Sequence, residues 1–269
     1  MNYYTFQATG PLKDYVKHFW VLEGQATVDK PYVHHFFADT CPELLFYYTG
    51  NFYESNPAQQ ADAPIKSGIT GQSQQGRKLT STSQFAVFGV YLYPYAAAHL
   101  FGIGAVELKN QMLDLKTILG KEADELEEKM MLASHNELRL QIIRSYLEKK
   151  LRSAAPVINP IWRSMQQIQK QNGFITIEEL AADYSLSPRQ FERNFQHFCG
   201  LNPKLFARIV RFQSAVKQLN HAGNSLTNVA YEANYYDQAH FIRDFKIFSG
   251  LKPKEFLKYH QKNSLWLTQ

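Results

Sequence analysis

The sequence FERNFQHFCGLNPKLF at residues 191–206 returns as FIRDFKIFSGLKPKEF at residues 241–256. At a spacing of 50 residues, nine of the sixteen positions are identical, which is far above chance. The identical positions are Phe191, Arg193, Phe195, Phe198, Gly200, Leu201, Pro203, Lys204 and Phe206. Upstream, Leu180-Ala181 corresponds to Val229-Ala230 after a shift of one residue. The chain therefore contains two copies of one structural unit.

Each copy is predicted to fold as a helix, a tight turn and a second helix. Ser, Thr and Asp suit helix N-caps, Glu179 three residues after Thr176 completes a capping box, and Pro188 suits a first helical position. Asn234 suits the left-handed conformation of a tight turn. The residues expected at the helix ends are Thr176, Ser187, Ser225 and Asp237 as N-caps, and Gly200 and Gly250 as C-terminal stops.

The second helix of each copy has the composition of a DNA-recognition helix. Phe191, Phe195 and Phe198 share one face and are expected in the core, so the opposite face is free for DNA. An Arg on that face can bond guanine bidentately. A charged, solvated helix face is the alternative interpretation. The residues expected to contact DNA are Ser187, Arg189, Glu192, Arg193 and Gln196 in the first copy, and Asp237, Gln238, Ala239, His240, Ile242, Arg243 and Lys246 in the second.

The positive charge is confined to the half of the chain that carries the repeat. Residues 1–159 contain 15 Lys and Arg against 16 Asp and Glu, a net charge of −1, whereas residues 160–269 contain 14 against 8, a net charge of +6. A basic domain favours a polyanionic partner such as double-stranded DNA. Lys204, Arg208, Arg211 and Lys217, between the two units, are expected to contact phosphates or solvent.

The first part of the chain is expected to be β-rich. Aromatic and β-branched runs at 32–37, 44–48 and 85–91 predict strands. Helical spacing then follows at about 112–151, where Ser134 and Glu137 suggest a capping box, and one apolar stripe there leaves self-association open. The predicted fold class is α+β: a β-rich, barrel-like domain with C-terminal helices at 1–155, and an all-α domain at 156–269 with helix-turn-helix units at about 176–200 and 225–250 joined by a helix.

The C-terminal region resembles the AraC/XylS transcription regulators over about 100 residues. The matching motifs are Arg193-x-Phe195, Gly200-Leu201-x-Pro203, Arg211-Phe212, Asp237-x-x-His240-Phe241-x-Arg243 and Gly250-Leu251-x-Pro253. Asn234 and Ala239 depart from the Gly and Ser common in the family. The resemblance implies two recognition helices in successive major-groove segments. More loosely, Asp39-Thr40-Cys41-Pro42-Glu43 and Gly89-Val90-Tyr91 resemble a sensor-type domain found ahead of such units.

The expected function is a sequence-specific transcription regulator, with activation as the expected mode and repression left open. The N-terminal domain is expected to sense a small molecule or to mediate dimerisation. The candidate effector-binding residues are Phe36, Phe46, Tyr48, Phe88 and Tyr91. RNA polymerase and a second copy of the chain are further candidate partners. The alternative is an enzyme or repair protein that uses the C-terminal helices only as a DNA tether.

Several classes of protein are disfavoured by the composition. Two cysteines, Cys41 and Cys199, do not support a disulfide framework, and no signal peptide or membrane span is indicated, so a cytoplasmic protein without membrane contact is expected. The chain lacks nucleophile and phosphate-loop motifs, so it is not expected to be an enzyme. No metal or other cofactor is expected, although His34 or His35 with His99 and Glu43 leaves a metal site as an open alternative.

Overall fold

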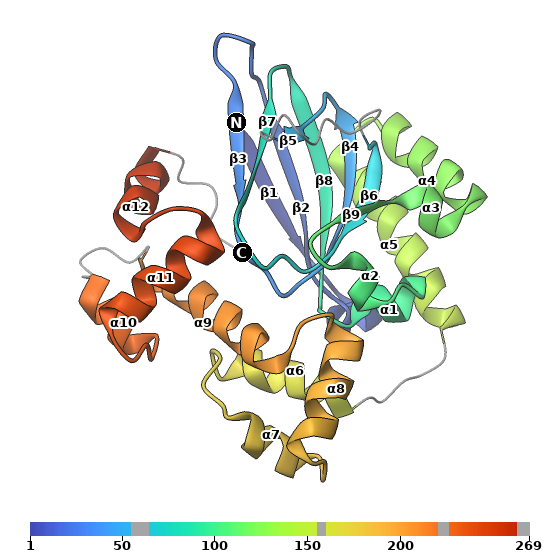
Figure 1. Ribbon diagram of the computed structural model, residues 1–269. Helices are drawn as coiled ribbons and strands as arrows, with labels where there is room; N and C mark the ends of the chain where they lie inside the picture. The colour runs from blue at the N-terminus through green and yellow to red at the C-terminus, as the bar shows by residue number, and fades with distance from the viewer. Residues whose placement is uncertain (55–64, 155–159, 220–225, 263–269) are drawn as a thin grey trace.

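The N-terminal part of the protein is built on two antiparallel sheets (Figure 1). The structure is a computed structural model that describes residues 1–54, 65–154, 160–219 and 226–262, with only the backbone at 259–262. The strands of the large sheet, in spatial order, are β1 (Asn2–Gln7), β2 (Val16–Gly24), β8 (Phe85–Leu92), β4 (Glu43–Thr49), β6 (Ser67–Thr70) and β9 (Met112–Asp114). Those of the small sheet are β3 (Tyr32–Phe36), β7 (Arg77–Ser81) and β5 (Tyr53–Glu54).

The central strand β8 is covered on both faces, which explains its unbroken apolar sequence. All eight of its residues are buried. On the inner face, Gly89 leaves room for the ring of Trp20, because a Cβ at this position would lie 2.1 Å from the indole. Farther along the same face, Phe85 stacks on Tyr32 of the small sheet with ring centroids 4.6 Å apart. The two sheets are therefore packed face to face.

Helices cover the outer face of the large sheet. There Phe46 and Phe88 are opposite each other on neighbouring strands, fully buried, and belong to the same core as Leu126, Met130 and Ile143 of the helices. The helical elements of this part are η1 (Gly10–Asp14), α1 (Ala96–Phe101), α2 (Ala105–Leu108), α3 (Leu115–Leu119), α4 (Lys121–Leu132) and α5 (Asn136–Ser153).

The three predicted strands are confirmed as β3, β4 and β8, and the helical region is confirmed with two corrections. Met112–Asp114 is a strand paired with β6, so the helices begin only at Leu115. The predicted capping box at Ser134 is wrong, because α5 begins at Asn136 after His135 and has no side-chain cap. The expected α+β class is confirmed. In the described residues, however, the strands form two separate sheets rather than one closed barrel.

The C-terminal part is all helical, and its helix ends follow the sequence closely. Its helices are α6 (Pro160–Lys170), α7 (Ile177–Asp183), α8 (Pro188–Cys199), α9 (Pro203–Leu219), α10 (Leu226–Glu232), α11 (Gln238–Ser249) and α12 (Pro253–Lys262). The capping box of Thr176 with Glu179 is present, and Ser187 and Asp237 accept hydrogen bonds from the first turns of α8 and α11. The expected cap Ser225 lies outside the described residues, as does the expected domain boundary at 155/156.

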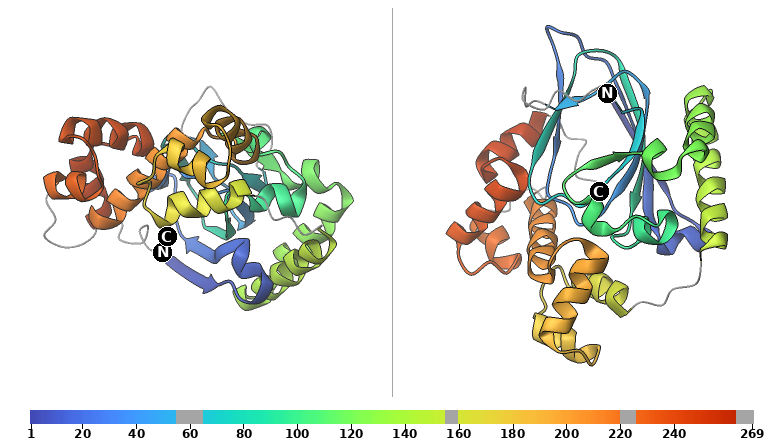
Figure 2. Two further views of the ribbon diagram at one scale, coloured as in Figure 1. Left: turned by 90° about the horizontal axis from the view of Figure 1, so that it is seen from below. Right: turned by 45° about the vertical axis from the view of Figure 1, so that its right-hand side comes forward.

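The two parts are packed against each other, with α9 beside the sheets (Figure 2). Helices α4 and α5 lie on the opposite side of the large sheet from α9 to α12 (Figures 1 and 2). Within the described ranges, every helix is too short or too polar to cross a lipid bilayer.

Candidate DNA-binding surface and domain-interface cavity

The two helix-turn-helix units share the same unusual turn. Ser185 in the first unit has a φ of 55°, and Asn234 in the second has a φ of 54°. This left-handed conformation is uncommon outside glycine. Ser185 and Asn234 are 49 residues apart. Leu180 and Val229, which correspond in the two copies, are separated by the same number, so Ser185 and Asn234 occupy equivalent places in the two turns. The repeat is therefore a repeat of backbone geometry as well as of sequence.

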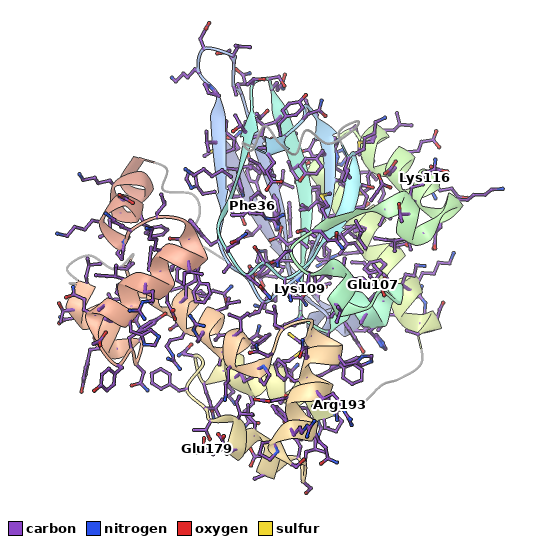
Figure 3. All side chains as sticks on the ribbon, in the orientation of Figure 1. Phe36, Glu107, Lys109, Lys116, Glu179 and Arg193 are labelled. Atoms are coloured by element: carbon purple, nitrogen blue, oxygen red, sulfur yellow. The ribbon has the colours of Figure 1, made fainter. Side chains whose placement is uncertain are left out.

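Helix α8 buries its aromatic face and presents its polar face outward. Phe191 and Phe195 are fully buried and Phe198 partly so, as predicted, whereas Arg189, Arg193 and Gln196 are exposed. Arg193 lies on a part of α8 that is remote from the two sheets (Figure 3).

A groove runs along this face, between α8 and the first half of α9. It brings together all five DNA-contacting residues predicted for the first unit, Ser187, Arg189, Glu192, Arg193 and Gln196. Lys204 and Arg208 of α9 line it as well. Four cationic side chains against one carboxylate give the groove a net positive charge, which favours phosphate and guanine as ligands.

Helix α11 also buries an aromatic face and presents an outward face, but the outward residues differ from those of α8. Phe241, Phe245 and Phe248 are buried, and six of the predicted DNA-contacting residues are exposed: Asp237, Gln238, Ala239, Ile242, Arg243 and Lys246. The seventh, His240, is only half-exposed. Its ring packs edge-on against Tyr235 at 5.2 Å, and its Nε2 lies 3.6 Å from Oδ2 of Asp244. His240 therefore faces the second unit's own core.

An ion pair fixes the second unit to the helix that joins the units. Nη2 of Arg208 lies 2.6 Å from Oδ1 of Asp244, and Nε donates to Oδ2 at 3.3 Å. The Asp244 side chain is only 1% exposed and that of Arg208 40%. This pair, with its hydrogen bonds, raises the pKa of Arg208. Arg208 was expected to be a phosphate contact or plain surface, and its main partner is instead a buried carboxylate.

A cavity of about 370 Å³ lies between the two sheets and reaches the C-terminal helices. Its walls include Trp20, Tyr91 and Phe36 from the sheets. Its remaining wall comes from α9, through Phe212, Gln213, Val216 and Lys217. The volume is within the range of small-molecule sites.

The cavity combines aromatic rings with ionisable groups. Tyr91 donates a hydrogen bond to Asp39, and Lys17 lies 5.0 Å from the centroid of the Tyr91 ring. Burial, with a smaller contribution from Asp39, raises the pKa of Glu43 to about 8. Its Oε2 has no hydrogen-bond partner among the described residues. The Glu43 carboxyl is therefore a neutral donor or acceptor at pH 7 and is free to bond a ligand.

Three histidines beside this carboxyl are neutral. Burial is the main cause in each case: it lowers the pKa of His34 to about 3, and those of His18 and His35 to about 4. His99 stacks on Tyr15 at 5.0 Å and is not among the residues that line the cavity. In the described part of the chain, no cluster of three His, Cys, Asp or Glu side chains could hold a metal ion.

The five predicted effector-binding residues are divided between two faces of the large sheet. Phe36 and Tyr91 line the cavity. Phe46 and Phe88 are buried against the helices on the other face. Tyr48 lies on that same face, where the Arg139 guanidinium stacks 3.7 Å from the ring centroid. One cavity therefore cannot contain all five residues. The cavity also has a polar lining, which was not predicted to bind an effector and includes Lys17, His18, Asp39, Glu43 and Arg77.

The N-terminal part contacts both helix-turn-helix units. Beside the first unit, Tyr95 stacks on Trp162 of α6 at 4.7 Å, and Gly200 at the end of α8 lies against the Ala105 backbone. Beside the second unit, the ring of Phe37 meets that of Phe256 of α12 at 5.4 Å, and Phe256 in turn packs against Phe245 of α11 at 5.2 Å. A change in the sheets can therefore reach both recognition helices.

Comparison with known proteins finds one family match in each part of the chain. Residues 180–259 match a helix-turn-helix domain family, and residues 4–114 match a domain of unknown function (DUF6597). The chain is 37% identical over 90 residues to an uncharacterised HTH-type transcriptional regulator of Haemophilus influenzae, covering 34% of this chain and 30% of the relative. It is 35% identical over 78 residues to the HTH-type transcriptional activator RhaS of Klebsiella pneumoniae, covering 29% and 28%.

A solved structure of ToxT from Vibrio cholerae O395 aligns over 89% of this chain and 97% of its own, with a TM-score of 0.49 and 9% identity. The matches to the two curated relatives span less than a third of their length. The helix-turn-helix family match covers both recognition helices, so residues 180–259 contain a helix-turn-helix domain, as the resemblance to the AraC/XylS regulators implies.

Proposed function

We propose that the protein is a sequence-specific DNA-binding transcription regulator that reads two successive major-groove segments with α8 and α11. The observation that carries this proposal is the pair of capped helices with the same turn geometry, each presenting an exposed Arg, Arg193 or Arg243, at the same distance from its N-cap. An Arg at this place can bond guanine, and the surrounding cations can contact phosphates. The relatives named as transcriptional regulators support the same function and give no support to an enzyme.

The test is to select bound duplexes from a random DNA library with the full chain at two salt concentrations. Enrichment of a bipartite motif, with half-sites about one helical turn apart, is the expected result. Strongly salt-dependent binding without an enriched motif would contradict sequence reading and leave only a basic tether. RNA polymerase and a second copy of the chain remain proposed partners.

We infer in addition that the cavity at the domain interface binds a small-molecule effector. Helix α9 supports this role, because its last turns line the cavity while its Arg208 holds Asp244 of the second unit. A ligand that contacts Phe212 or Val216 would therefore act directly on the helix that joins the two readers. This route does not pass through α4 and α5, which lie on the far side of the large sheet (Figure 1).

The coupling has a defined energetic limit. An effector shifts DNA affinity only by the difference between its affinities for the two states of the protein. A thermal-shift screen of small metabolites would find ligands, and Val216→Trp, which fills the cavity from α9, should abolish the shift of any hit. Equal operator affinity with and without a saturating hit would contradict the coupling.

A further inference from the structure

The two recognition helices present different chemistry at equivalent positions. Counted from the N-caps Ser187 and Asp237, the outward positions pair Arg189 with Ala239, Glu192 with Ile242, Arg193 with Arg243, and Gln196 with Lys246. Two charged residues of the first unit are thus replaced by apolar residues in the second. The last two pairs remain polar in both units, so the difference is confined to the N-terminal half of the reading face.

The two apolar residues on the outward face of α11, Ala239 and Ile242, lie outside the buried core. The Ile242 side chain is 37% exposed, Ala239 is also exposed, and neither belongs to a hydrophobic cluster of the described residues. Ala239 lies on the opposite side of the helix from the fully buried Phe241 and Phe245, whereas Ile242, three residues before Phe245, lies on the flank between that buried side and the outward face. Ile242 and Ala239 are therefore both accessible to a partner that approaches the outward face of α11.

The partner that fits this position is a base edge carrying a methyl group. Ile242 and Ala239 lie on the same exposed face as Arg243, in the part of a recognition helix that meets base edges. The C5-methyl of thymine is the apolar group that the four bases offer in the major groove, and small apolar side chains contact it. A charged residue such as Glu192 at the equivalent place of α8 would instead bond an exocyclic amine.

We propose that the second unit recognises thymine C5-methyl groups through Ala239 and Ile242, whereas the first unit reads its half-site by hydrogen bonds from Arg189, Glu192 and Arg193. This inference rests on the proposed DNA-reading function. It predicts an asymmetric operator, with thymine concentrated in the half-site that α11 reads.

The experiment replaces thymine by deoxyuridine, which lacks only the C5-methyl, in one half-site at a time of the selected duplex. The half-site of the second unit is first assigned as the one in which Arg243→Ala relaxes base preference. Deoxyuridine in that half should weaken binding by about fourfold for each methyl fully buried in the complex. The same replacement in the other half should change affinity by less than twofold.

Two variants make the test specific. Ile242→Ser should weaken binding to the thymine duplex and reduce the effect of deoxyuridine. Ile247→Ser is the matched control, because Ile247 is also an exposed isoleucine of α11, 47% exposed, but lies in the last turn, where its carbonyl accepts a hydrogen bond from Gly76 of the N-terminal part. It should keep the full deoxyuridine effect.

Each outcome separates this inference from the function on which it rests. A bipartite motif whose second half is insensitive to both deoxyuridine and Ile242→Ser would overturn methyl reading while leaving the DNA-binding function intact. The apolar face of α11 would then be assigned to a protein partner instead. If no motif is selected at all, the proposed function and this inference both fail.

Discussion

The backbone N–H of Ala38, just after β3, donates a 2.7 Å hydrogen bond to the carbonyl oxygen of Phe248 in the last turn of α11. This bond connects a loop at the mouth of the cavity to the recognition helix of the second unit, since Ala38 lines the cavity. Gly76 reinforces the contact by donating to the Ile247 carbonyl at 3.4 Å. The N-terminal part and the second helix-turn-helix unit are therefore joined by main-chain contacts, which move only with the backbone.

Gly76→Ala should loosen this junction. The added Cβ would lie 2.4 Å from the carbonyl carbon of Ser249, and because this atom belongs to the backbone, it cannot rotate away. We expect a loss of about 1–3 kcal/mol in the free energy of unfolding, as for other overpacking substitutions, and faster amide hydrogen exchange in the last turn of α11.

The matched control for this substitution is Gly104→Ala. Its added Cβ would meet only Oε1 of the flexible Glu107 side chain, at 2.9 Å. It should leave exchange in α11 unchanged. Unchanged exchange in Gly76→Ala as well would show that the two parts are not held together at this contact.

Arg208→Met should destabilise the second unit by leaving the Asp244 carboxylate buried without its cation. Loss of one partner from a fully buried pair costs roughly 3–5 kcal/mol. We expect less here, because the Arg208 side chain is 40% exposed. Chemical denaturation of Arg208→Met, Asp244→Asn and the double variant would measure the coupling. The double variant should be more stable than Arg208→Met alone, and strict additivity of the two losses would contradict the ion pair.

Local sequence signals predicted the helix-turn-helix units well because their determinants are local. A cap, a turn residue and a stop lie within a few positions of the helix they define, as with Thr176, Ser187 and Gly200. Each was visible in a single sequence. The repeat then supplied a second, independent copy of the same signals.

The cavity could not be predicted in the same way because it depends on distant parts of the chain. Strand alternation alone separates Phe88 from Tyr91, three residues apart on β8. The placement of Phe46 beside Phe88 depends on the register of β4 with β8, which no local signal gives. The closure of the cavity by Val216, from a helix more than a hundred residues later, has no local signature. The same holds for β9, which depends on its pairing with β6.

Glu43→Gln should stabilise the protein increasingly as the pH rises. The folded state keeps the Glu43 proton up to a pKa of about 8, whereas the unfolded chain loses it near 4.5. The native state therefore binds more protons between these values, and its free energy of unfolding falls with rising pH by at most about 1.4 kcal/mol per pH unit. Glutamine removes this loss, so the advantage of the variant should grow between pH 5 and pH 8.

Denaturation with urea at several pH values measures this advantage. Glu128→Gln is the control, since Glu128 is an exposed glutamate on α4, and it should give a constant difference from the parent. A constant difference for Glu43→Gln would show that Glu43 is already ionised in the folded protein.

Acidification should destabilise the protein through its neutral histidines. In the folded protein the pKa of His34 is lowered to about 3, and those of His18 and His35 to about 4. The unfolded chain therefore binds protons at these histidines near pH 6.5, whereas the folded protein does not. Their contribution to stability is present above pH 6.5 and is lost as the pH falls toward 4. His34→Asn should flatten this fall in urea denaturation, whereas substitution of the exposed His197 should not.

Arg193→Ala should cost about 1–3 kcal/mol of specific DNA binding and relax base choice in the first half-site only. The reason is that Arg193 is exposed in the groove of the first unit, whereas the second unit carries its own Arg243. Binding to the selected duplex and to single-base variants would measure both effects. Arg152→Ala, an exposed arginine on α5, removes the same charge away from the groove and should leave base choice unchanged. Arg193→Ala could instead weaken binding equally on every sequence and reduce the number of counterions released on binding by about one. Arg193 would then contact a phosphate, and neighbouring side chains would read the bases.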